Sequence, residues 1–161
     1  MAITRIGGAN AITGTIPTSV APGKGKVLQV VQGSKSTQTN VSSTTFTDLG
    51  LSATITPSST SNKILIDVNI AVRRGSGIQN SGAKMKLYKN GSELEQISSG
   101  FGFGQGSSEE STGNVGFRYL DTPSTTSSIT YSIYGGSSGG NFIYYFIDNG
   151  FSTITLKEIE G

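Results

Sequence analysis

Several residue types that carry chemistry are missing from this sequence of 161 residues. It contains no cysteine, no histidine and no tryptophan. Without cysteine there are no disulfides, thiolate metal sites or cysteine nucleophiles. Without histidine there are no imidazole bases or imidazole metal ligands. These absences favour a structural or binding role over catalysis.

Charge is also scarce. Charged residues make up 14% of the chain, against the usual quarter or so, and the net charge is +2. The basic residues are scattered apart from the pair Arg73-Arg74, which we interpret as a solvated strand end rather than a phosphate contact. We therefore expect no nucleic-acid partner.

Long apolar runs are absent as well. No segment approaches the roughly 20 apolar residues of a membrane-spanning helix, and the N-terminus lacks an apolar run of signal-peptide length. We expect a soluble protein that is made in a cytoplasm and has no membrane partner.

The ten acidic residues do not form a recognisable catalytic pattern. Asp67 together with Asp121 or Asp148 could be drawn as a glycosidase pair, but any ten acids permit such a drawing. Glu109-Glu110 is better explained as a solvated loop tip than as a calcium site. The glycines of residues 100–106 lack the spacing and the Lys-Ser/Thr ending of a phosphate loop. We expect no enzyme, no cofactor and no metal.

The clearest pattern that is present lies in residues 63–72. Alternate positions there are β-branched and apolar, while the positions between them are mixed and partly polar. This period of two predicts a strand with one face in a core. The apolar positions are Ile64, Ile66, Val68, Ile70 and Val72.

Similar short segments recur along the chain and are separated by Gly, Ser, Thr and Asn. The dipeptide Asn90-Gly91 is the strongest hairpin signal, because a type I′ turn needs positive φ at both central residues. The predicted strands are 26–32, 36–41, 51–56, 63–72, 83–88, 93–98, 115–120, 129–133, 141–147 and 151–159. Eight to ten strands without a helix predict an all-β fold in one domain, residues 26–161. We expect a two-sheet antiparallel sandwich in the form of a jelly roll.

Residues 1–25 do not resemble the rest of the chain. Glycines and prolines interrupt any periodicity, yet apolar residues recur singly at Ile3, Ile6, Ile12, Ile16 and Val20. We expect an extended N-terminal arm that docks these side chains into a neighbouring subunit or partner. The alternative is a terminus without fixed structure.

One predicted strand is apolar on both faces, and residues 27–31 have the same character in milder form. Phe142, Tyr144 and Phe146 share one face. Ile143, Tyr145 and Ile147 share the other. Since soluble monomers rarely expose such a surface, we expect a homo-oligomer interface here, with a trimer as the expected order. Phe101 and Phe103 are assigned to the same contact. The alternative to an oligomer is that a loop of the same chain covers the second face of strand 141–147.

Sugar binding is a second possibility. Jelly rolls host lectins, and tyrosines can stack on sugar rings, although alternating tyrosines in a strand are also ordinary core or interface residues. The candidates are Tyr119, Tyr131, Tyr134, Tyr144 and Tyr145.

Four segments resemble virion structural proteins of tailed bacteriophages, particularly those that infect cyanobacteria. These segments are 24–32, 51–72, 119–126 and 152–159, so the resemblance spans about residues 24–159. It implies a β-sandwich module found as a knob on capsids or as the tip of tail fibres, commonly trimeric.

The resemblance favours one location over the other. A fibre tip usually follows a long shaft, whereas some two dozen residues precede the module here. We therefore expect a capsid decoration, or cement, protein of the virion that grips the major capsid protein or other virion proteins by its arm. The alternative is a tail-fibre or adhesin tip that binds host-surface glycan.

Overall fold

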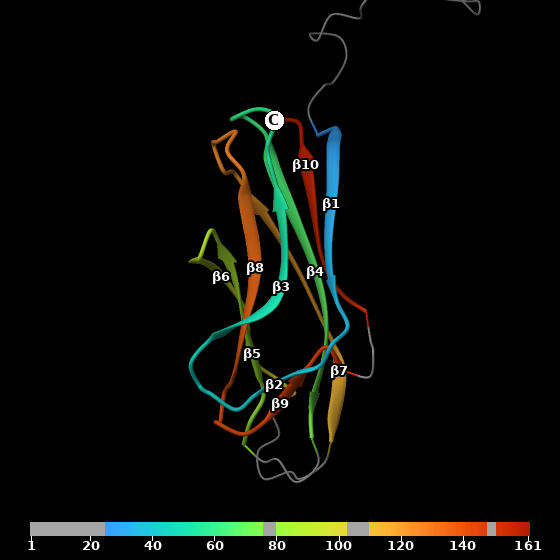
Figure 1. Ribbon diagram of the computed structural model, residues 1–161, viewed down its shortest axis with the longest axis vertical. Helices are drawn as coiled ribbons and strands as arrows, with labels where there is room; N and C mark the ends of the chain where they lie inside the picture. Colours follow the sequence, from blue (N-terminus) through green and yellow to red (C-terminus); the bar gives the residue numbers. More distant parts are fainter. Residues whose placement is uncertain (1–24, 76–79, 103–109, 148–150) are drawn as a thin grey trace, which may run out of the picture.

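The computed structural model describes residues 25–75, 80–102, 110–147 and 151–161, which form an elongated two-layered sandwich (Figure 1). Its strands are β1 (Val27–Lys35), β2 (Thr39–Val41), β3 (Thr47–Ile55), β4 (Lys63–Arg74), β5 (Ala83–Lys89), β6 (Ser92–Phe101), β7 (Ser111–Asp121), β8 (Ile129–Ser137), β9 (Ile143–Tyr145) and β10 (Ser152–Ile159). Within these ranges no helix is long and apolar enough to cross a membrane.

The strands pair as a single antiparallel ribbon that is folded back at its middle. β1 pairs with β10, β2 with β9, β3 with β8, β4 with β7 and β5 with β6. The turn of the ribbon is at Asn90 and Gly91, whose φ angles of 49° and 80° confirm the predicted hairpin turn.

Rolling this ribbon produces two sheets. The additional pairs β10–β4, β4–β9 and β5–β8 close the roll. The larger sheet, called sheet A, contains β1, β10, β4 and β7 with the short β9 and β2, and sheet B has the order β3-β8-β5-β6. Nested pairing rolled into two sheets is the jelly-roll topology, so the predicted fold class is confirmed.

The core lies between the sheets and follows the predicted alternation. All five β-branched residues of β4 are buried, as are the predicted inward residues of β3, β5 and β8. Fully burying a side chain of this size contributes roughly 1.5–3 kcal/mol. The inward residues of β3, β5 and β8 are Leu51, Ala53, Ile55, Ala83, Met85, Leu87, Ile129, Tyr131 and Ile133.

A buried polar cluster connects the two sheets. The Tyr131 hydroxyl of β8 donates a hydrogen bond to the Asp121 carboxylate of β7 (2.6 Å). Lys89, at the end of β5, forms an ion pair with the same carboxylate oxygen (2.7 Å). Burial raises the pKa of Tyr131, and the bond to Asp121 raises it further. The phenol therefore remains a donor at physiological pH.

The predicted two-sided strand at 141–147 is wrong. β9 ends at Tyr145, and Phe146 has a positive φ of 60°, which breaks the alternation of faces. As a result Tyr145 and Phe146 are both buried in the core, as are Ile143 and Ile147. The chain itself covers these four side chains, and Phe142 remains exposed.

The prediction that Arg74 lies at a solvated strand end is also wrong. Its side chain is only 4% exposed, because β4 continues to this residue and β7 and β9 pair with it there. The neighbouring Arg73 places its guanidinium over the Tyr144 ring, 4.9 Å from the ring centroid. The end of β4 is therefore packed rather than solvated.

Two strand glycines offer a matched stability test. A Cβ at Gly33 would collide with the backbone of Ser52 in β3, whereas a Cβ at Gly116 would meet nothing within 4 Å. Gly33→Ala should lower the free energy of unfolding by about 1–3 kcal/mol. Gly116→Ala should leave it unchanged or raise it by about 0.5–1 kcal/mol. Urea denaturation of both variants measures the difference, and equal effects would contradict the packing of β1 on β3.

Candidate interaction surfaces

The acidic residues considered for catalysis do not converge. Asp67 lies on the outer face of sheet A, while Asp121 points to the inner face and is paired with Lys89. Asp148 lies outside the described residues. Among the described residues there is no group of three or more metal-ligating side chains of His, Cys, Asp or Glu. The surfaces of the two sheets are therefore the places to look for function.

Glu158 forms the most connected polar cluster in the described part of the chain. Its carboxylate accepts hydrogen bonds from the Ser58 backbone amide (2.7 Å) and hydroxyl (2.8 Å) and from the Asn62 side-chain amide (2.6 Å). The Gln29 side-chain amide also donates to it (2.6 Å). Glu158 thereby ties the β3–β4 connection to β10 and β1, which is a structural role.

These donors decide the ionisation of Glu158. Burial alone would raise its pKa, but the hydrogen bonds from Asn62, Gln29 and Ser58 together outweigh burial and lower the pKa to about 2. The carboxylate is therefore charged at every physiological pH.

The outer face of sheet A carries exposed apolar side chains. Val30 of β1 is 57% exposed and Leu120 of β7 is 50% exposed. The strand registers align them in a row across the sheet that consists of Val30, Lys157, Leu65 and Leu120. Val27 and Leu28 extend the exposed apolar surface along β1.

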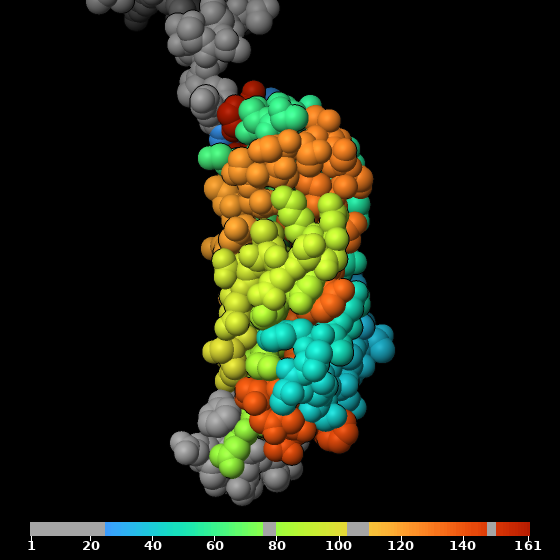
Figure 2. Space-filling view, turned by 90° about the vertical axis from the view of Figure 1, so that its left-hand side faces the viewer, coloured from blue at the N-terminus to red at the C-terminus, as the bar shows by residue number. Residues whose placement is uncertain are grey.

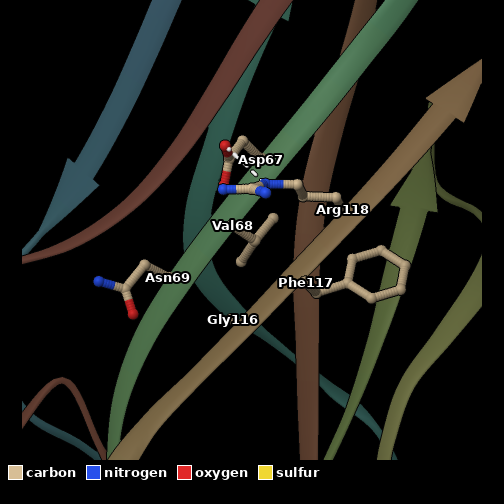
Figure 3. A pocket seen from close by; sticks show the side chains of 6 residues that line it. All are labelled: Asp67, Val68, Asn69, Gly116, Phe117 and Arg118. Atoms are coloured by element: carbon tan, nitrogen blue, oxygen red, sulfur yellow. Dashed lines mark hydrogen bonds and ion pairs between the residues drawn. The ribbon is translucent and has the colours of Figure 1, made fainter.

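A depression lies beside this row, between β4 and β7 (Figure 3). It has a volume of about 640 Å³ and is lined by Asp67, Val68, Asn69, Gly116, Phe117 and Arg118. Figure 3 shows the Arg118 guanidinium reaching toward the Asp67 carboxylate, and the Nε atom donates to it at 3.2 Å. Gly116 contributes no side chain, which leaves the floor of the depression open.

The outer face of sheet B carries a different set of side chains. Tyr88 and Tyr134 stack with their ring centroids 3.8 Å apart. The ammonium groups of Lys84 and Lys86 lie 4.7 and 4.5 Å from the centroid of the Phe46 ring. Figure 2 shows the side on which β5 and β6 occupy the middle of the surface, with the β7–β8 connection above them. This face is aromatic and mixed in charge.

The tyrosines proposed for sugar stacking are dispersed. Tyr131 and Tyr145 are fully buried, so they cannot meet a ligand. Tyr119 packs against the core, and Tyr144 lies against Arg73. Tyr134 is stacked on Tyr88 and lies on the outer face of sheet B.

Few of the predicted interface residues remain accessible. Phe142 is 53% exposed, Phe101 is partly exposed and Tyr144 is half-buried. Phe103 lies outside the described residues, as do the arm residues Ile3, Ile6, Ile12, Ile16 and Val20.

The sequence predicted apolar residues on both faces of residues 27–31, but it did not predict the row that Val30 forms with Leu65 and Leu120 across sheet A. The relevant signal was the leucine within the otherwise polar face of β4, Leu65. The sequence alone could not show which residues of β1, β7 and β10 lie beside that leucine.

Solved structures with this fold include viral proteins. VP2 of infectious bursal disease virus, solved as a subviral particle, aligns with a TM-score of 0.54 and 14% identity over 83% of this chain and 33% of that chain. A structure of the Gx strain of the same virus aligns with a TM-score of 0.50 and 17% identity over 83% and 32%. The chain thus spans about a third of the length of these proteins.

Sequence comparison adds no relative. No family model matches the chain, and neither does any curated protein. At these identities the structural likeness shows a fold shared with viral proteins. The two viral structures are not from a bacteriophage, so the resemblance to tailed-phage proteins stays a prediction.

The pKa of Glu158 predicts acid sensitivity. Because its pKa in the folded state, about 2, lies below the ordinary 4.5, the charged form stabilises the fold. This contribution is complete above about pH 4.5 and is lost as the pH falls toward 2. Urea unfolding from pH 7 to 2 should show this loss for the natural chain. Glu158→Gln should be less stable by about 1–3 kcal/mol at pH 7 and lack this titration; parallel pH curves would contradict the assignment.

Proposed function

We propose that this protein is a non-enzymatic structural component of a virus particle that associates with copies of itself. The jelly-roll topology shared with VP2 of a subviral particle is the observation that carries the proposal. Exposed apolar side chains on the outer face of sheet A support it, since soluble monomers seldom leave such surfaces open.

The specific role that we propose is that of a capsid decoration protein of a tailed bacteriophage. It forms a trimer and is anchored to the major capsid protein through residues 1–25. This role rests on the sequence resemblance and on the spaced isoleucines of the arm.

Of the interface residues predicted from the sequence, Phe101, Phe142 and Tyr144 are the described ones that remain accessible. They are one of two candidate contacts between copies, and the outer face of sheet A is the other. Ile143, Tyr145, Phe146 and Ile147 no longer need a second copy to cover them.

The anchoring role predicts separable effects of arm changes. Full-length Ile12→Lys/Ile16→Lys protein should keep the unfolding midpoint of the natural chain, because the sandwich core is built from residues beyond 25. Its binding to virus shells that lack this protein should fall by about tenfold or more, since two buried apolar contacts are lost. Co-sedimentation measures this binding.

A control keeps the charge and changes the position. Ser36→Lys/Thr37→Lys, at two exposed sites between β1 and β2, adds the same two charges and should leave shell binding unchanged. Undiminished binding of the arm variant would contradict anchoring through residues 1–25.

The rival function is that of an adhesin tip that binds host-surface carbohydrate. The stacked pair Tyr88 and Tyr134 on the outer face of sheet B is the observation that favours it. Under the decoration role, a glycan array should show no reproducible binding by the natural chain. Binding that Tyr134→Ala abolishes, and that Tyr144→Ala leaves intact, would favour the adhesin instead.

A further inference from the structure

The outer face of sheet A is a flat surface with an apolar row at its centre. Val30 and Leu120 stand at the two edge strands, and Leu65 lies between them on β4. Three of the four strands contribute an apolar side chain to this row, and the half-buried Lys157 of β10 lies between Val30 and Leu65. This alignment distinguishes the row, called the strip, from the single exposed apolar residues normal on surfaces. The strip continues along β1 through Val27 and Leu28.

Gly116 indicates that another molecule approaches this surface closely. It occupies the middle of edge strand β7, where glycine weakens a strand. Nothing within the described chain requires glycine there, because its φ is not positive and a Cβ would meet no atom within 4 Å. A side chain at this position would fill the depression next to the Asp67–Arg118 pair.

The charges around the strip restrict what can dock on it. Lys63, Lys157 and Arg118 lie close to the strip, and Asp67 is the acid that the latter two contact. Lys63 is exposed and has no ion-pair partner among the described residues. Two copies meeting face to face about a two-fold axis would therefore bring cations together.

The same chain carries a complementary surface at the opposite sheet. Glu95 of edge strand β6 is exposed and pairs with no cation in the described part of the chain. Leu94 and Ile97 of the same strand pack against the core but are only partly buried, so their accessible sides offer apolar contact at the edge. In Figure 1, β6 lies at the same height along the long axis as the middle of β4.

We propose that the outer face of sheet A in one copy docks on the β6 edge of the next copy. In this contact Lys63 meets Glu95, and Leu65 and Leu120 cover Leu94 and Ile97. The contact is head-to-tail because its two surfaces differ, and it builds a closed ring when the rotation between successive copies closes. The proposal rests on the proposed self-association and names the surfaces that carry it.

Charge reversal tests the proposed pair directly. Lys63→Glu and Glu95→Lys, each alone in the full-length chain, should weaken association by at least about fivefold, since each places like charges in contact. The double variant should recover most of the affinity. Multi-angle light scattering over a concentration series at 50 and 500 mM salt measures the association, which should weaken at the higher salt.

Apolar and steric variants test the strip itself. Leu120→Lys and Gly116→Trp should each abolish association while the unfolding midpoint stays close to that of the natural chain, because both positions are exposed. Phe142→Lys is the matched control and should associate normally. Phe142 is about as exposed as Leu120, and it lies in none of the four strands that carry the strip.

The possible outcomes separate the proposed contact between sheet A and β6 from the broader proposal that the protein associates with copies of itself. A natural chain that stays monomeric at all concentrations overturns both self-association and this interface. Association that Phe142→Lys abolishes, and that Leu120→Lys and Gly116→Trp leave intact, overturns only the interface. Stronger association of Lys63→Glu alone, with no effect of Glu95→Lys, indicates a two-fold face-to-face dimer and also overturns the head-to-tail contact.

Discussion

Register between the two halves of the chain is the constraint on which the structure depends. Each strand before Asn90-Gly91 pairs with the strand at the same distance after it, from β5–β6 at the turn to β1–β10 at the far end. A shift by one residue in β4–β7 would turn Ile64 through Val72 outward. The buried contacts of Asp121 with Tyr131 and Lys89 also require this alignment.

Much of the fold could be predicted because the alternation of residue types within a strand shows which of its side chains point into the core. The alternation in β3, β4, β5 and β8 identified nearly every buried apolar residue of those strands, and Asn90-Gly91 identified the turn. The failure at 141–147 has a local cause that alternation cannot report. A positive φ at Phe146, a residue type that rarely adopts one, turns two successive side chains into the core.

The candidate surfaces were harder to predict, because they depend on residues far apart in the sequence. Leu65 and Leu120 are neighbours only through the register of β4 with β7, and Val30 joins them only through β10. Single exposed apolar residues are common, so none of the three is informative alone. Likewise, the hydrogen-bond donors that hold Glu158 of the last strand come from the β3–β4 loop and from the first strand.

The pairing of Gly25 and Lys26 with Glu160 determines how the molecule can be held. The Gly25 amide donates to the Glu160 carbonyl (2.8 Å), and the Glu160 amide donates to the Lys26 carbonyl (2.8 Å). Both segments therefore leave the sandwich at one pole, while β4 and β7 meet at the other through Arg74 and Ser111 (Figure 1). A contact made through either segment therefore turns this pole toward the partner and leaves the pole of Arg74 and Ser111 facing away from it.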